Sequence, residues 1–295
     1  MSRRVALLAT LALVGVTASW GSTFFLIHDL LTRMPVVDFL AVRFVVAAVA
    51  MVVAVPRAVG RLSHSKQRHA VVLGLLYGLA QILQTAGLAH TAASVSGFIT
   101  GMYVVLTPVF AAAILRTRIG ALTWAAVMLA VAGLGVLTLS GLHVGFGEAV
   151  TLVAAVLYAL HIVGLGAWST TRDALGMAIL QTIVIAVVCT VAAIPGGIAL
   201  PSRAADWASV VYMALVAGAG ALLVQTWAQA HLTPTRTAIV MTMEPVFAAF
   251  FAVVAGGEHA GTRMLLGGAM VLGAMLLVEL APRRKVEGES PHIAV

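Results

Sequence analysis

The side chains best placed to do chemistry are two full charges inside long apolar runs. Arg43 lies seven residues into a run that begins at 36, and Glu244 lies eight residues into a run that begins at 236. If these runs cross a bilayer, each charge is roughly 10 to 12 Å below the surface. A charge at that depth costs about 2.5 to 3.5 kcal/mol unless it is paired or hydrated.

Two interpretations of these charges follow. In the functional one, Glu244 carries a coupling proton or binds a substrate ammonium, and Arg43 orients a carboxylate or neutralises Glu244. In the structural one, the two residues form a buried ion pair that serves packing alone. His161, in another apolar run, is a second candidate for a proton relay, although a lone histidine is more often a hydrogen-bonded packing residue.

Uncharged polar side chains recur at helical spacing within other apolar runs, so that each set falls on one helix face. The sets are Ser96, Thr100, Tyr103 and Thr107; Tyr77, Gln81 and Gln84; Tyr158 and His161; and Gln225 and Gln229. Facing lipid, such groups would go unsatisfied at a cost of several kcal/mol, so we expect them to face protein or water. They could line a substrate cavity together with Trp20 and Ser22. The alternative is interhelical hydrogen bonding at about 0.6 to 2 kcal/mol per contact.

Two prolines sit inside apolar runs and mark an internal repeat. The segment Leu106-Thr107-Pro108-Val109-Phe110 returns 137 positions later as Met243-Glu244-Pro245-Val246-Phe247. A proline removes a backbone hydrogen bond, so we expect both Pro108 and Pro245 to bend their helices beside the cavity, as gating elements or as static kinks. Only the second copy carries a carboxylate, because Thr107 stands at the position of Glu244.

The composition places these runs in a bilayer. Of the 295 residues, 62% are hydrophobic and 9% are charged, with a mean hydropathy of +1.09. Soluble domains are about 25% charged. The net charge of +7 comes from basic loops, as membrane topology requires, and we do not expect nucleic-acid binding. The single cysteine, Cys189, excludes an intrachain disulfide and a thiolate metal cluster.

Ten apolar runs are long enough to be spans, so we predict an all-α integral membrane protein with ten transmembrane helices. They lie near 5–28, 36–55, 70–90, 93–115, 119–140, 147–169, 175–197, 207–230, 236–255 and 261–281. With the N-terminus inside, cytoplasmic segments hold thirteen Lys and Arg and the outer loops hold three, so both termini are predicted to be cytoplasmic. The first run is too long for a signal peptide, and we expect no cleavage.

The repeat covers the whole chain. Gln84-Thr85 followed by His90 returns 141 positions later as Gln225-Thr226 followed by His231. Each half has five predicted spans, an odd number, so the second half must be inverted relative to the first. We predict a first repeat over 1–142, a second over 143–282, and a cytoplasmic tail over 283–295.

Several short motifs in this order resemble the EamA family of the drug/metabolite transporter superfamily. They are Trp20-Gly21-Ser22-Thr23-Phe24, Ala41-Val42-Arg43-Phe44, Glu244-Pro245-Val246-Phe247, Gly257-Glu258, Gly267-Gly268 and Gly273, with the stretch from Thr91 to Phe110 similar to one bacterial branch. The resemblance implies a ten-helix transporter of amino acids or other small metabolites that does not hydrolyse ATP. One departure is that Arg116-Thr117-Arg118 replaces the Gly-Glu expected after the fourth span.

Motifs of other classes are absent from the sequence. It has no Gly-x-x-x-x-Gly-Lys-[Ser/Thr], no Gly-x-Ser-x-Gly and no His-Glu-x-x-His. We therefore expect a cofactor-free secondary transporter of the bacterial inner membrane, an exporter by resemblance, whose partners are a small-molecule substrate and the lipid bilayer, as a monomer or homodimer. The alternatives are an integral-membrane enzyme, which would need His90, His161, His231 and Glu244 to converge, and a membrane receptor or scaffold.

Overall fold

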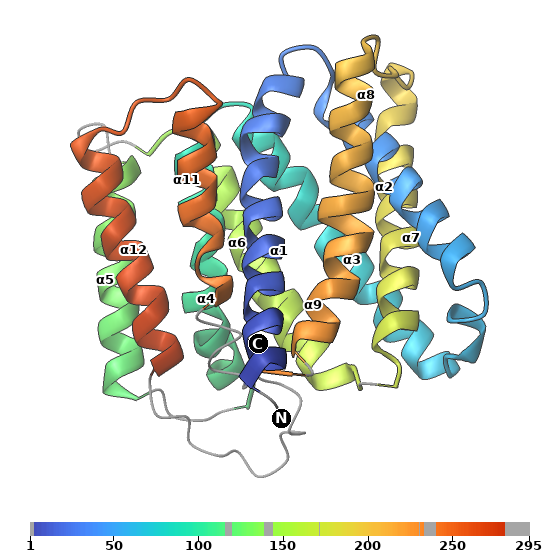
Figure 1. Cartoon of the computed structure of the whole chain (residues 1–295), viewed down its shortest axis with the longest axis horizontal. Helices are drawn as coiled ribbons and strands as arrows, with labels where there is room; N and C mark the ends of the chain where they lie inside the picture. Colours follow the sequence, from blue (N-terminus) through green and yellow to red (C-terminus); the bar gives the residue numbers. More distant parts are fainter. Residues whose placement is uncertain are drawn as a thin grey trace.

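The computed structural model describes residues 3–115, 120–138, 144–170, 172–229, 231–232 and 240–280, which form a bundle of helices lying side by side (Figure 1). No strand occurs in this part of the chain. The α-helices are α1 (Arg3–Leu30), α2 (Val36–Ala54), α3 (His64–Leu88), α4 (Ala93–Leu115), α5 (Ala121–Thr138), α6 (Phe146–Trp168), α7 (Ala174–Ala193), α8 (Ala204–Val211), α9 (Ala221–Gln229), α11 (Glu244–Val254) and α12 (Thr262–Leu280). Short 3₁₀ turns, η1 (Val59–Arg61) and η2 (Ile194–Gly196), follow α2 and α7.

Within the described residues, seven helices are long and apolar enough to cross a membrane, and three shorter apolar helices lie at Ala204–Gly220, Glu244–Val254 and Thr262–Val278. These ten helices overlap the ranges of the predicted spans, but three are shorter than a full span, so the count of ten spans stays a prediction. Large apolar side chains cover the outside of the bundle, among them Val53 at 74% exposed and Phe250 at 53%. In water such a surface would be unfavourable, whereas lipid tails accept it. The chain is therefore a multi-pass membrane protein.

The third helix begins earlier than its apolar run. We predicted a start near 70, but α3 begins at His64 because Ser63 caps it, its hydroxyl accepting from the Lys66 backbone N–H at 3.4 Å. The polar first turns hold the end of the helix outside the apolar layer. Hydropathy alone marks only the apolar part of such a helix.

The eighth predicted span is not a uniform α-helix. Between α8 and α9 the backbone follows a nine-residue π-helix, η3 (Tyr212–Gly220). A π-helical segment shifts backbone pairing from i+4 to i+5 and often marks a functional site. Gly218 and Gly220 lie in this segment. The hydropathy pattern contains no signal for this change.

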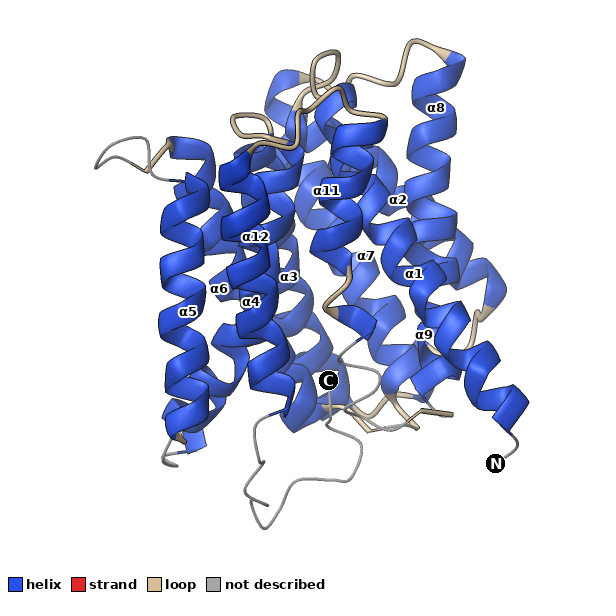
Figure 2. Cartoon of the chain, turned by 60° about the vertical axis from the view of Figure 1, so that its left-hand side comes forward, coloured by secondary structure: helices blue, strands red, loops and turns tan. Residues whose placement is uncertain are grey.

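The two prolines lie at different places in their helices, and a bend at Pro108 stays a prediction. The 23-residue helix α4 continues through Pro108 without a break, because one lost backbone bond is tolerated in a long buried helix. At the other site a turn occupies residues 242–243, and α11 starts at Glu244 with Pro245 in its first turn. In Figure 2 this turn is the tan segment below α11. Residues 236–239 of the predicted span lie outside the described part of the chain.

Helix contacts occur in matched pairs across the two halves of the chain. The contact of α3 with α6 matches that of α9 with α1. Likewise, the contact of α4 with α6 matches that of α11 with α1. Three further contacts, α2 with α7, α4 with α11 and α5 with α12, each join helices that are equivalent in the two halves. The largest core cluster lies between α1, α2, α7 and α11 around the fully buried Phe39 and Leu40. The bundle is therefore built from contacts between halves.

Candidate functional site

A chain of hydrogen bonds links three helices in the interior. Tyr158 on α6 donates from Oη to Gln84 Oε1 on α3 at 2.7 Å, and Gln84 Nε2 donates to Thr100 Oγ1 on α4 at 3.2 Å. Tyr158 and Thr100 are buried, and Gln84 is half-buried. The stripes on three separate helices therefore do converge on one interior position.

Glu244 extends this cluster to α11. The Tyr103 hydroxyl donates to Glu244 Oε2 at 3.5 Å, the long end of the hydrogen-bond range, and the Tyr103 ring lies edge-on to Tyr158 with centroids 6.5 Å apart. Glu244 is half-buried and begins its helix directly after the turn at 242–243. An acidic residue in the first turn is favoured by the helix dipole. The break before α11 thus delivers a carboxylate and a helix N-terminus to the same interior region.

Arg43 lies within electrostatic reach of Tyr77 and Tyr158. Its guanidinium carbon is 5.3 Å from the Phe44 ring centroid, and both Tyr77 and Tyr158 interact electrostatically with Arg43 and with Glu244. Tyr77 and Tyr158 meet edge-on at 5.2 Å. Among the ion pairs of the described residues none joins Arg43 to Glu244, so the two are not the contact pair that one interpretation required. Arg43 and Glu244 are therefore two opposite charges that share Tyr77 and Tyr158 as neighbours and form no ion pair with each other.

His161 is held by a partner that we did not single out. Its Nε2 lies 2.7 Å from Gln181 Oε1, and Gln181 Nε2 donates to the Met177 carbonyl at 3.2 Å. The His161 ring contacts Tyr77 edge-on at 5.0 Å, and Tyr77 Oη accepts from Gln81 Nε2 at 3.3 Å. His161 and Gln81 thus adjoin the cluster through Tyr77. The sequence carried one signal for Gln181, since it is the repeat counterpart of Arg43.

Three predicted site residues lie elsewhere, where α1 meets η3 and α9. Trp20 Nε1 donates to the Ala217 carbonyl of η3 at 2.8 Å. The Ser22 hydroxyl lies 2.8 Å from Tyr212 Oη, a partner missed from the sequence. The Gln225 amide donates to Met241 Sδ at 3.5 Å. These contacts hold helices together, and a role of the three residues in binding substrate stays a prediction.

The remaining candidates line the junction of α4 and α11. Pro245 is buried, and its ring packs beside Gly101 of α4. Pro108 is half-buried, and the preceding Thr107 hydroxyl donates to the Tyr103 carbonyl at 2.7 Å within its own helix. The prolines therefore shape backbone around Tyr103 and Glu244.

A family model described as the EamA-like transporter family matches residues 7–139 and again residues 145–280. The chain belongs to the EamA-like transporter family. An uncharacterized transporter of Archaeoglobus fulgidus is 26% identical over 275 residues, covering 93% of this chain and 86% of that protein. A crystal structure of a protein with 18% identity superposes with a TM-score of 0.64 and covers 92% of this chain and 96% of its own, which shows a shared fold.

Membership of this family makes the chain a membrane transporter by class. In the structure, Gly257-Glu258, one of the motifs that resemble this family, has a structural role. The Glu258 carboxylate accepts from the Ala93 backbone N–H at 2.7 Å, from the Ser94 N–H at 3.3 Å and from the Ser94 hydroxyl, and so caps the N-terminus of α4. The segment from Arg116 to Arg118, which stands where the first half would carry the corresponding Gly-Glu, lies outside the described residues. The Gly-Glu motif thus holds a helix in place at a distance from the polar cluster.

Proposed function

We propose that this EamA-family chain is a secondary active transporter that exports a small amphiphilic metabolite, such as an amino acid, across the bacterial inner membrane by alternating access. The observation that carries the proposal is the interior polar cluster, in which Arg43 and Glu244 form no ion pair, both lie near Tyr77 and Tyr158, and Glu244 accepts a hydrogen bond from Tyr103. Its residues come from α2, α3, α4, α6 and α11, so both halves of the chain contribute.

The separation of the two charges favours a ligand that carries both signs. An ammonium would sit beside Glu244 and a carboxylate beside Arg43, each replacing part of the hydration that the ligand loses. The hydroxyls and amides of the cluster offer both donors and acceptors, and the rings of Tyr77 and Tyr158 would contact an apolar side chain. If Arg43 and Glu244 were in direct contact, no space would remain between them for a ligand.

Alternating access needs two halves that can move about a shared site. The matched helix contacts support an inverted repeat with a division near residue 142. The contact of α3 with α6 corresponds to that of α9 with α1, and the contact of α4 with α6 corresponds to that of α11 with α1. Two inverted halves of five spans each would place both termini at the same membrane face. The distribution of Lys and Arg favours the cytoplasmic face. Glu244 is the candidate for proton coupling, because the transport cycle would bring it to each side in turn.

Reconstitution tests the function directly. Purified protein in proteoliposomes would be given radiolabelled amino acids, nucleobases and sugars, with and without an imposed pH gradient, and empty liposomes and Arg43→Gln protein would serve as controls. We expect uptake of an unmodified zwitterion that depends on Arg43. Conversion of the label to product would instead identify an enzyme, and saturable binding without uptake would identify a receptor.

A further inference from the structure

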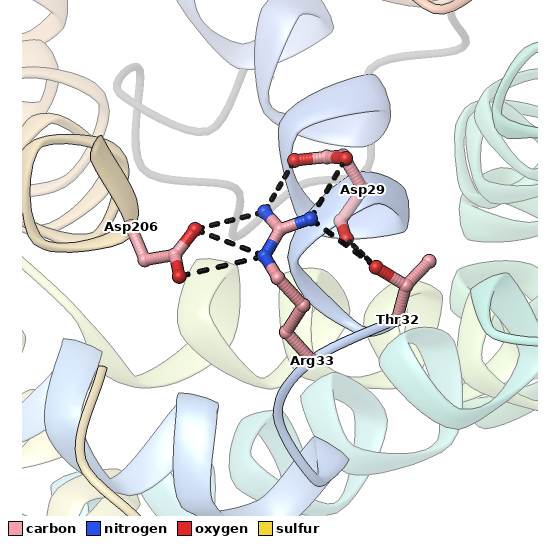
Figure 3. Close-up of polar contacts among 4 residues, drawn as sticks. All are labelled: Asp29, Thr32, Arg33 and Asp206. Carbon is pink, nitrogen blue, oxygen red and sulfur yellow. Dashed lines mark hydrogen bonds and ion pairs between the residues drawn. The ribbon is translucent and has the colours of Figure 1, made fainter. Parts of the chain in front are cut away.

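An arginine ties three segments together at one end of the bundle (Figure 3). Arg33, in the connection between α1 and α2, forms an ion pair with Asp29 of α1 at 2.5 Å and with Asp206 of α8 at 2.8 Å. Arg33 Nε also donates to Asp206 Oδ1 at 3.1 Å, so the α8 carboxylate is held by two guanidinium nitrogens. Asp206 is 3% exposed. We call these three residues the Arg33 clasp.

A lysine ties three segments together at the opposite end, the end at which α1 begins. Lys66 of α3 donates to the Trp168 carbonyl, the last residue of α6, at 2.5 Å. Its ammonium also lies 3.5 Å from Asp173 Oδ2, in the connection between α6 and α7. Thr170 donates to the same carboxylate oxygen at 2.8 Å. We call Lys66, Trp168 and Asp173 the Lys66 clasp.

The two clasps occupy equivalent positions of the repeat with their charges exchanged. Asp206 is the third residue of α8, and Lys66 is the third residue of α3, 140 positions earlier. Arg33 and Asp173, in the connections after α1 and α6, are also 140 positions apart. Each clasp therefore joins the end of a first helix, the connection that follows it, and the first turn of a third helix. In the Arg33 clasp the third helix supplies the carboxylate of Asp206, and in the Lys66 clasp it supplies the ammonium of Lys66.

We propose that the Arg33 clasp and the Lys66 clasp are the paired gates of the transporter, each closing the entrance at its own membrane face. This inference rests on the proposed transport by alternating access. The charge-bearing tips come from different halves in both cases: Arg33 meets Asp206, and Lys66 meets Asp173. Separation of the halves at one face must therefore break the clasp at that face. Contacts of this kind, made in one state and broken in the other, bias a two-state equilibrium.

The clasps differ in strength, which sets the resting state. The Arg33 clasp has a bidentate guanidinium and a buried carboxylate, and hydrogen bonds with Asp29 and then Asp206 raise the pKa of Arg33 above its usual value. At the same face Asp38 Oδ2 accepts from the Ala199 backbone N–H at 3.0 Å. The Lys66 clasp has a single ion pair whose side chains are 25% and 23% exposed, a class that contributes little in water. The face of Lys66 is therefore the one that opens first.

Side-specific labelling tests the gates without requiring flux. A reporter cysteine at Gln84→Cys, in a Cys189→Ala background, would be exposed to a membrane-impermeant maleimide from one face at a time in oriented vesicles. We expect Lys66→Gln to raise labelling from the Lys66 face by about two- to fivefold, the range for an exposed pair. Asp206→Asn should raise labelling from the Arg33 face by about tenfold, since it breaks a buried pair.

A charge exchange separates gating from general loosening. Lys66→Asp alone should raise labelling at least as much as Lys66→Gln does, because it sets a second carboxylate against Asp173. Lys66→Asp with Asp173→Lys should return labelling to the parent rate. Arg68→Gln, on the same helix and exposed, is the matched control and should leave labelling unchanged. Unchanged labelling in Lys66→Gln and Asp206→Asn, or no recovery in the exchanged pair, would overturn the gates.

The same experiment keeps the gates distinct from the transport proposal. Labelling that shifts as expected, together with no solute uptake by the protein that keeps Gln84, would support the clasps as gates of the cavity and refute transport. Uptake that proceeds with labelling unaffected by the clasp variants would leave transport in place and refute the gates. Thermal melting of each variant in detergent identifies any that fails to fold. If Asp206→Asn fails to fold, the labelling of the variants at the partly exposed Lys66 pair tests the gates by itself.

Discussion

Tyr103 of α4 and Glu244 of α11 meet through one long hydrogen bond of 3.5 Å. Another carboxylate, that of Glu258 in the connection between α11 and α12, is fixed by the two N–H groups and the hydroxyl at the start of α4. One carboxylate is therefore locked and the other is loosely held. A group that exchanges a proton or a ligand during a cycle must be able to change partners, and of the two only Glu244 is so placed.

Glu244→Gln should uncouple transport while leaving the fold intact. The amide keeps the shape and the contact with Tyr103 but cannot take up or release a proton, so substrate exchange should continue while uptake driven by a pH gradient is lost. Counterflow and gradient-driven uptake would be compared in the same proteoliposomes. Full gradient-driven, concentrative uptake in this variant would remove Glu244 from the coupling step.

Glu258→Gln is the matched control for that change. It weakens the cap of α4, so we expect a loss of about 1 kcal/mol of stability with pH-driven uptake retained. Thermal melting in detergent and uptake at two pH values would separate the two variants. A cap variant that also lost pH dependence would mean that both carboxylates act in one coupled network.

Tyr158→Phe should weaken substrate binding more than it weakens the fold. The ring remains against Tyr77, but Gln84 loses the donor at 2.7 Å that fixes its side chain. A hydrogen bond of this kind contributes about 0.6 to 1.5 kcal/mol, so the apparent KM for uptake should rise by about three- to tenfold. Tyr212→Phe removes an equivalent hydroxyl from the Ser22 contact, outside the cluster, and its KM should not change. Equal effects on KM in both variants would argue against a site at Tyr158.

Trp20→Phe should destabilise the protein by about 1 kcal/mol, because the Ala217 carbonyl of the π-helical segment loses its indole donor. Trp124→Phe, whose ring is 50% exposed on α5, is the control and should melt close to the parent protein. Melting in detergent, followed by fluorescence or light scattering, measures the difference. Equal melting temperatures for the two variants would show that the Trp20 contact adds nothing to stability.

Sequence periodicity predicted the parts of this molecule that depend on local pattern. Apolar runs located the helices, and the i, i+4, i+7 stripes located Thr100 and Tyr103, which the fold does bring to Gln84 and Tyr158. Prediction stopped where a partner comes from far along the chain. The acceptor of Trp20 is 197 residues away, and nothing near Trp20 encodes it.

The clearest feature that the sequence did not reveal is the pairing of charged residues that were counted only as loop charges. Arg33 entered the sequence argument as one of three basic residues in outer loops, and its pairing with Asp206 depends on α8 lying beside the end of α1. A comparison of charged positions across the repeat would have exposed the exchanged pairs, since both intervals are 140 residues. The π-helix of η3 had no comparable signal, because its hydropathy equals that of an ordinary helix.

Two glycines of α1 give a stability test with an internal control. Helix α1 crosses α11 at Gly21, where an added Cβ would lie 2.5 Å from Phe247 Cβ and 2.7 Å from the Ala248 backbone nitrogen. Because backbone cannot move aside as a flexible side chain can, Gly21→Ala should force α1 and α11 apart at a cost of about 1 to 3 kcal/mol. Gly15, six residues earlier on the same helix, has nothing within 4 Å of such a Cβ, so Gly15→Ala should be neutral or stabilising by up to about 1 kcal/mol.

The direction of the two shifts carries the argument. Alanine is the better helix former at both positions, so helix propensity alone predicts that both variants melt at higher temperature. Opposite shifts in melting temperature would therefore isolate the α1–α11 contact, which positions Glu244 at the start of α11. Reduced pH-driven uptake in Gly21→Ala, with uptake unchanged in Gly15→Ala, would further show that this close approach sets the position of the carboxylate. A Gly21→Ala protein as stable as its Gly15→Ala counterpart would mean that the helices do not approach so closely.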